Sequence, residues 1–393
     1  MADQRGKKWY IFCGYLMLLG IGFLAGGRQI VLEDITDTFQ MGNTGIGIFT
    51  ACWPMAVMVT ALLCGGLADI ISKKKIIGIF GAILTAGTII GSFAGSAIAV
   101  MAAFFMIGIG VAIVNGTMAS ALLETDPSGS IRFSTMTQVF YASGAVLGPM
   151  ILSGFLEKGA SWRLYFIIGA ILYFIATLLF VTSPYKTIVP AKRPKKKKGE
   201  KRKKGGILCL VLICFIISGG MYATMENCYL DFIKSYYVNE LSNEALAGIV
   251  ISVGWISMVP ARLAITRLKK KKGLVAGGCC IVAALMALVL VFTRNAVVAL
   301  ICTSIFGLSC GPVYPIVLSM MMDAFPSHTG LVSNLVLFGC GVFNSLGSLL
   351  SGMVNDAVGL GNGYALVAVY CIITGLFAYL GWRRGVQEEK LSE

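Results

Sequence analysis

Residues 65–75 read GGLADIISKKK, and residues 261–271, which lie 196 positions further along the chain, read ARLAITRLKKK. Leu, Ala and three Lys occupy matching places in the two stretches, and an apolar segment precedes each of them. The dipeptides Lys7-Lys8 and Lys203-Lys204 stand at the same separation. A repeat of this length predicts that the chain consists of two halves with the same order of structural elements.

The composition is typical of a membrane protein. Of the 393 residues, 57% are hydrophobic and only 13% are charged, and the mean hydropathy is +0.84. A soluble domain carries roughly 25% charged residues. A soluble enzyme, a nucleic-acid-binding protein and a disordered chain are therefore excluded, despite a net charge of +14. The 48 Gly residues fit close packing between helices in lipid, where small residues let backbones approach.

Twelve apolar runs are long enough to cross a bilayer, since a spanning helix needs about 20 mostly apolar residues. They lie near 9–32, 44–68, 76–96, 98–122, 133–155, 162–182, 207–233, 245–266, 274–292, 296–322, 330–354 and 363–382. The first run is too long for a cleaved signal peptide, and Arg28 and Glu33 follow it in place of a small-residue cleavage site. We therefore expect an all-α membrane protein with six spans in each half.

Lys and Arg are distributed unevenly between the two sides of these spans. If the N-terminus is cytoplasmic, most of the 32 basic residues fall on the cytoplasmic side, and Arg262 is counted among them. The opposite side keeps Arg28, Lys158, Arg163, Lys234 and Arg294. Cytoplasmic loops carry an excess of Lys and Arg. We therefore expect an integral protein of the cytoplasmic membrane with both termini in the cytoplasm.

A basic linker divides the chain into bundles of residues 1–182 and 207–393. The linker, residues 183–206, contains a run of basic residues from Lys192 to Lys204 that looks like a nucleic-acid-binding tract. A cytoplasmic connection between two bundles explains the run without nucleic acid, and the same charges can contact anionic lipid. The 12 Cys show no metal-ligand spacing with His, so no metal or cofactor is expected.

The motif Gly65-x-Leu67-Ala68-Asp69, with Lys73, Lys74 and Lys75 after it, resembles the signature loop of the major facilitator superfamily. The twelve spans, the basic central loop and the weaker second copy of the motif agree with this resemblance over the whole chain. It implies two pseudo-symmetric six-helix bundles around a central cavity, and a transporter instead of an enzyme.

The resemblance also assigns a role to Asp69, which ends the second span beside a cationic loop. In the superfamily such an acid holds the two halves together on the cytoplasmic side, so Asp69 and the lysines from Lys73 to Lys75 are expected to form a cytoplasmic gate. The usual Arg and Gly of the motif are Ile70 and Ser72 here, which changes the charges around that gate. A simple helix-end acid near three Lys is the alternative.

A second resemblance concerns spans 7 and 10. Residues 222–226, YATME, are similar to the Tyr-x-Gly-x-Glu pattern of the fucose, galactose and glucose:proton symporters, and residues 311–315, GPVYP, resemble their Gly-x-x-x-Pro segment. The chain departs from these symporters at Thr224, where they have Gly, and at Asn115, where they often have Glu. The resemblance implies a sugar substrate and proton coupling.

Two charged residues inside spans are candidates for transport, since each costs about 2.5–3.5 kcal/mol at the membrane centre. Glu226, interpreted as a lone acid in its helix, is expected to couple proton movement to solute movement. Arg28 lies at a similar height in the first span, where it would bind an anionic or hydroxyl-rich substrate or neutralise Glu226. In the alternative reading, both side chains are simply solvated near the outer interface.

Polar and aromatic residues deeper in the spans complete the expected substrate cavity. Trp53 and Trp255 fall near the middle of their spans, away from the interfaces where Trp is usual, and each can stack on a sugar ring or another flat ligand. The other expected cavity residues, each of which could instead serve helix packing, are Asn115, Gln138, Tyr141, Tyr222, Tyr314, Asn334 and Asn344.

These observations predict a secondary active transporter that moves a small polar solute, a sugar or an organic acid, by alternating access and in symport with protons. A proton-driven efflux antiporter is the first alternative. The Gly144-x-x-x-Gly148-Pro149 segment favours it, and the lack of a membrane-embedded Arg near Phe104 opposes it. The alternative of another class is a membrane scaffold or sensor. The expected partners are the solute, protons and membrane lipids, and the chain is expected to be monomeric.

Overall fold

A computed structural model of the chain describes residues 2–64, 71–123, 125, 130–185, 205–265, 268, 271–325 and 329–392. Its first six helices are α1 (Ala2–Thr38), α2 (Asn43–Cys64), α3 (Lys73–Ser92), α4 (Ala97–Leu123), α5 (Ser130–Leu156) and α6 (Arg163–Thr182). The remaining helices are α7 (Gly205–Asn239), α8 (Glu244–Ala264), α9 (Lys272–Phe292), α10 (Ala296–Cys310), α11 (Val313–Ala324), α12 (Thr329–Val358) and α13 (Leu360–Ser392).

The described residues contain 12 helical segments that are long and apolar enough to cross a membrane, which confirms the predicted spans. The tenth span consists of two helices, because α10 ends at Cys310 and α11 begins at Val313. Gly311 and Pro312 stand between them, and Pro315 follows one turn later. Proline removes a backbone donor and interrupts the ladder of helical hydrogen bonds. Pro54, Pro149 and Pro260 are accommodated inside α2, α5 and α8.

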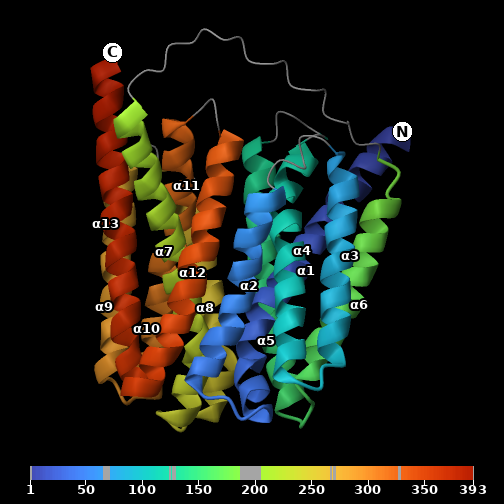
Figure 1. Cartoon of the computed structure of the whole chain (residues 1–393), viewed down its shortest axis with the longest axis vertical. Helices are drawn as coiled ribbons and strands as arrows, with labels where there is room; N and C mark the ends of the chain where they lie inside the picture. Colours follow the sequence, from blue (N-terminus) through green and yellow to red (C-terminus); the bar gives the residue numbers. More distant parts are fainter. Residues whose placement is uncertain are drawn as a thin grey trace.

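The helices pack as an upright bundle in which α1 begins and α13 ends at the same end (Figure 1). We call this the terminal end, and the opposite one the distal end. Within the first half α1 contacts α5 and α6, and α3 contacts α4 and α6; within the second half α13 contacts α7 and α9, and α8 contacts α10. The halves meet where α2 lies against α12 and α5 against α8, with smaller contacts from α1 to α7 and α8.

The linker predicted for residues 183–206 lies almost entirely outside the described residues, so its role and the domain boundaries stay predictions.

Large apolar side chains cover the outside of the bundle. On α6, Ile171, Phe174 and Leu178 are each more than half exposed, and on α9 Ile281 and Leu285 are as well. Such a surface is stable in contact with lipid, whereas in water it would promote association. The packing therefore agrees with an integral membrane protein.

The glycines of α5 have a packing role that explains the antiporter-like segment. A Cβ atom on Gly144 would overlap the carbonyl oxygen of Leu19, and one on Gly148 would lie 2.5 Å from the carbonyl oxygen of Phe23. Glycine at these two positions lets the backbones of α1 and α5 touch, as small residues do in membrane helix pairs. This close contact accounts for Gly144 and Gly148 without assigning export.

Candidate functional site

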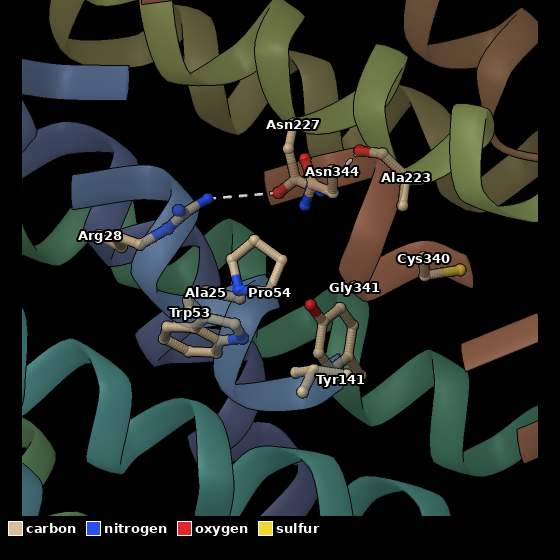
Figure 2. Close-up of a pocket in the computed structure, with 11 residues that line it drawn as sticks. Ala25, Arg28, Trp53, Pro54, Tyr141, Ala223, Asn227, Cys340, Gly341 and Asn344 are labelled. Carbon is tan, nitrogen blue, oxygen red and sulfur yellow. Dashed lines mark hydrogen bonds between the residues drawn. The ribbon is translucent and has the colours of Figure 1, made fainter. Parts of the chain in front are cut away.

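A cavity of about 130 Å³ lies between the two halves (Figure 2). Residues of α1, α2 and α5 line it from the first half, and residues of α7 and α12 from the second. The lining residues are Ala25, Arg28, Trp53, Pro54, Val57, Tyr141, Ala223, Asn227, Cys340, Gly341 and Asn344. The lining combines two aromatic rings, two side-chain amides and a guanidinium. Sites for small molecules are commonly apolar clefts with a few convergent polar groups, and this one has that composition.

An ion pair between the halves lies beside the cavity. Arg28 Nη2 on α1 lies 2.8 Å from Asp231 Oδ1 and 3.2 Å from Asn227 Oδ1, both on α7. Only 5% of Arg28 and 2% of Asp231 are exposed. The guanidinium also lies 5.7 Å from the centre of the Trp53 ring, within the range of a cation–π interaction. One arginine therefore connects the aromatic wall of the cavity with its amide wall and with a buried carboxylate.

Two expectations about these charges were wrong. Glu226 is not the lone acid of its helix, because Asp231, which already lies inside the predicted span 207–233, is part of the same helix α7. The ion pair of Arg28 is with Asp231, whereas Glu226 has a different partner, so Arg28 does not neutralise Glu226 here. The near-complete burial of Arg28 also contradicts the alternative in which its side chain is solvated at the interface.

A second ion pair lies within the C-terminal half. Glu226 Oε1 accepts a hydrogen bond from the Tyr222 hydroxyl at 2.6 Å and lies 3.3 Å from Arg262 Nη2. The ring of Tyr222 stacks on that of Tyr314 at 5.4 Å between centroids. Arg262, which was counted with the basic residues of the cytoplasmic side, lies in the last turn of α8, inside the predicted span 245–266, and only 17% of its side chain is exposed.

The break in span 10 supplies a further partner for Arg262. Pro315 has no N–H, so the carbonyl oxygen of Gly311, four residues earlier, lacks its usual helical donor. Arg262 Nε donates to this oxygen at 3.2 Å. A backbone group freed at membrane depth must find another partner, and here the partner is a cation. Interrupted helices in transporters often mark the position of a binding site.

Gln29 and Trp255 form another contact between the halves. The indole nitrogen of Trp255, on α8, donates to Gln29 Oε1, on α1, at 2.9 Å. Trp255 is 3% exposed, and its ring meets Tyr141 edge-on at 6.1 Å between centroids. The ring of Trp255 is therefore a support behind Tyr141, and Trp53 is the tryptophan that lines the cavity.

The expected site residues fall into four groups. Arg28, Trp53, Tyr141 and Asn344 line the cavity. Tyr222 and Glu226 contact Arg262, and Tyr314 stacks on the ring of Tyr222. Outside the cavity lining are Trp255, Asn115, which is half-buried, and Gln138, which is exposed. The side chain of Asn334 lies outside the described part of the structure.

Of the expected gate, Asp69 also lies outside the described residues. Lys73, Lys74 and Lys75 open α3, with Lys75 exposed. Lys74 Nζ donates to the carbonyl oxygens of Ser183 and Tyr185, which follow the end of α6. A lysine that satisfies carbonyl groups at a helix C-terminus stabilises that end. Lys74 thus has a packing role inside the first half, and the gate itself stays a prediction.

Sequence reasoning missed Asn227, Asp231 and Arg262 as site residues. Asn227 follows Glu226 directly, and Asp231 is an acid inside an expected span, which the rule that marks Glu226 would also have marked. Arg262 stands near the end of the predicted span 245–266, and it was counted only with the basic residues that follow it. In each case the residue type was informative, but the sequence did not show which side chains of other helices it contacts.

Twelve spans in two packed halves, with a polar cavity between them, define the class of the protein as a membrane transporter. The family model of the Major Facilitator Superfamily matches residues 11–348. The chain belongs to the major facilitator superfamily, whose members are transporters and not enzymes.

The chain is also similar to individual transporters and related proteins, in sequence or in structure. The chain is 23% identical over 266 residues to the glucose/mannose transporter GlcP of Bacillus subtilis (strain 168), an alignment that covers 63% of each chain. It is 23% identical over 261 residues to a protein TsgA homolog of Buchnera aphidicola subsp. Schizaphis graminum, covering 65% of this chain and 64% of that one. The alignments thus span slightly less than two thirds of these relatives. The structure of the nucleoside transporter NupG covers 96% of this chain and 99% of its own with a TM-score of 0.72, at 13% identity.

Proposed function

We propose that the protein is a secondary active transporter for an uncharged, hydroxyl-rich solute, a sugar, which it carries across the cytoplasmic membrane together with protons. One observation carries the substrate class. The cation at the cavity, Arg28, already has its counter-charge in Asp231 at 2.8 Å. An organic acid would compete with Asp231 for Arg28 and would leave a buried carboxylate without its partner, which is costly. A neutral solute avoids this cost.

The other cavity groups suit a sugar. The amides of Asn227 and Asn344 can donate and accept hydrogen bonds, and so can the Tyr141 hydroxyl. The flat ring of Trp53 offers an apolar surface for the C–H face of a pyranose. The volume of about 130 Å³ is small beside the roughly 300–1,000 Å³ of sites for drug-sized ligands. These features favour a small solute over the drugs of an efflux pump. The name of the relative GlcP supports the same substrate class.

Proton coupling is proposed for Glu226. Its carboxylate is held by Tyr222 and Arg262, and 12% of its side chain is exposed. A proton on Glu226 would remove the attraction to Arg262 and leave that guanidinium with the carbonyl of Gly311. Protonation of Glu226 would therefore change the contacts of Arg262 at the break between α10 and α11.

We further propose that both termini are cytoplasmic, that the protein works by alternating access, and that it is a monomer.

The test is counterflow in proteoliposomes loaded with unlabelled glucose, mannose or a dicarboxylate. Entry of labelled sugar driven by internal sugar, with no entry of labelled dicarboxylate, is the expected result. Asn227→Ala should reduce sugar counterflow, whereas Gln138→Ala, a change on the exposed face of α5, should not. Counterflow of the dicarboxylate alone would contradict the proposal for a neutral substrate.

A further inference from the structure

A carboxylate of the second half binds the first turn of a helix in the first half. Asp356, near the distal end of α12, accepts hydrogen bonds from the backbone N–H groups of Asn43 at 3.0 Å and Thr44 at 2.7 Å, and from the Thr44 hydroxyl. Asn43 and Thr44 are the first two residues of α2. The first N–H groups of a helix have no acceptor within it, and a negative charge is favoured there. Asp356 supplies both the hydrogen-bond acceptor and the negative charge, and it does so from the other half of the protein.

The backbones of α2 and α12 touch directly behind this contact. A Cβ atom on Gly352 would lie 2.5 Å from the carbonyl oxygen of Asn43, and one on Gly47 would lie 2.6 Å from the carbonyl oxygen of Ser348. Both distances are too short for a real side chain. The two glycines therefore allow the approach that brings Asp356 within reach of α2, and the carboxylate holds the helices in this position.

Other contacts between the halves lie at the same distal end. Lys234 on α7 donates to the carboxylate of Asp34 on α1 at 2.8 Å, and the Ser153 hydroxyl on α5 donates to the carbonyl of Gly248 on α8 at 2.7 Å. The distal side of the cavity is thus closed by contacts on three helix pairs. Lys234 also donates to the backbone carbonyl of Ile30 on α1 at 2.8 Å. The contact of Asp356 differs in that one carboxylate accepts from two backbone N–H groups at the start of a helix.

We propose that Asp356 is the latch that holds the cavity closed toward the distal side, and that it must release the first turn of α2 before the cavity can open there. The proposal rests on membership of the transporter family and on none of the substrate, proton or orientation proposals above. Asp69 follows the other end of α2 in the sequence and is expected to close the terminal side, so loss of the two acids should have opposite effects.

The experiment uses Cys340, which lines the cavity, as a reporter. In a full-length chain that keeps Cys340 as its one cysteine, a membrane-impermeant maleimide is applied separately to each face of sealed vesicles of known orientation. Asp356→Ala should raise the labelling rate from the distal face about threefold to tenfold, because contacts of a charged group with a helix N-terminus are worth roughly such a factor. Gly352→Ala, which wedges the helices apart, should act in the same direction, and Asp69→Asn should instead raise labelling from the terminal face.

Glu240 provides a matched control. It also places a carboxylate at a helix N-terminus, accepting from the Gly361 N–H at 2.6 Å, but both residues belong to the second half. Glu240→Gln should leave labelling from both faces unchanged. Distal labelling that is unchanged in Asp356→Ala and in Gly352→Ala would overturn the proposal, as would an equal rise in Glu240→Gln. If Asp356→Ala is not recovered as a folded protein, Asp356→Asn and Thr44→Val replace it, each with a smaller rise expected.

Discussion

Arg28 and Asp231 form an ion pair 2.8 Å long that joins α1 to α7 across the interface of the two halves. Neither residue has more than a twentieth of its surface exposed, so the pair is shielded from water and lipid alike. Its members come from equivalent helices of the two halves, and one of them lines the cavity. The pair therefore connects the wall of the cavity with the interface between the halves.

The first prediction concerns the stability of this pair. Asp231→Asn should lower the free energy of unfolding by about 3–5 kcal/mol, because Arg28 is left as a buried charge without its partner. The double change Arg28→Met with Asp231→Leu should recover most of that loss, since apolar residues of similar volume need no counter-charge. Thermal unfolding in detergent gives the comparison.

The control for this prediction is Lys272 and Asp323, an ion pair of 2.7 Å in which Asp323 is 65% exposed. Asp323→Asn should cost less than about 1 kcal/mol, as surface pairs do. Equal losses of unfolding free energy in the two Asp→Asn variants would show that burial does not increase the contribution of the Arg28–Asp231 pair to stability.

The second prediction concerns coupling. Glu226→Gln keeps the shape of the side chain and removes the proton-binding carboxylate. It should abolish accumulation driven by an imposed pH gradient while equilibrium exchange of substrate continues. Flux into proteoliposomes, measured with and without the gradient, separates the two activities. Glu240→Gln is again the control and should keep both. Continued accumulation by Glu226→Gln would assign coupling to a different residue.

The third prediction concerns substrate binding at the amide wall. Asn227 Nδ2 donates to the Ala223 carbonyl and its Oδ1 accepts from Arg28, so the amide is fixed beside the cavity. Asn227→Ala should weaken binding about tenfold, the loss expected for one to two hydrogen bonds. Asn227→Asp should weaken it further, because a second carboxylate would compete with Asp231 for Arg28. Ligand-dependent thermal shifts measure both, and unchanged shifts would remove Asn227 from the site.

The fourth prediction concerns orientation. Replacing the four lysines from Lys195 to Lys198 by Gln should leave both termini in the cytoplasm, because many other Lys and Arg residues remain on that side. Accessibility of a C-terminal tag to protease in intact cells is the measurement. A tag that becomes accessible from outside would contradict the orientation drawn from the basic residues.

The spans could be predicted because length and hydropathy suffice to identify them, but their ends could not. The apolar run at 9–32 ends before Glu33 and Asp34, yet α1 continues to Thr38, since helical hydrogen bonding extends beyond the apolar part. In the same way, the run at 207–233 ends before Lys234, yet α7 extends to Asn239. A hydropathy window detects the apolar part of a helix that faces lipid. It does not detect the last helical turns, which carry charged residues and contact other parts of the protein.

The site could be predicted only in its residue types. Arg28 and Glu226 were both identified as charges inside spans, but sequence gave no means of pairing them, because each partner lies on another helix. Arg28 pairs over 203 positions, and Glu226 over 36. The break after Cys310 was similarly visible as Gly311-Pro312, but its consequence, a carbonyl presented to Arg262, depends on the position of α8.

The two ion pairs also determine how the membrane voltage would act on the transport cycle. The charges of Arg28 and Asp231 cancel, and so do those of Arg262 and Glu226. With Glu226 as the coupling acid, the empty carrier moves with no net charge in these pairs, whereas the carrier loaded with a proton and a neutral solute moves with one positive charge. An electric potential of 100 mV then contributes about 2.3 kcal/mol per cycle, and it acts on the loaded step while leaving the return of the empty carrier insensitive to voltage.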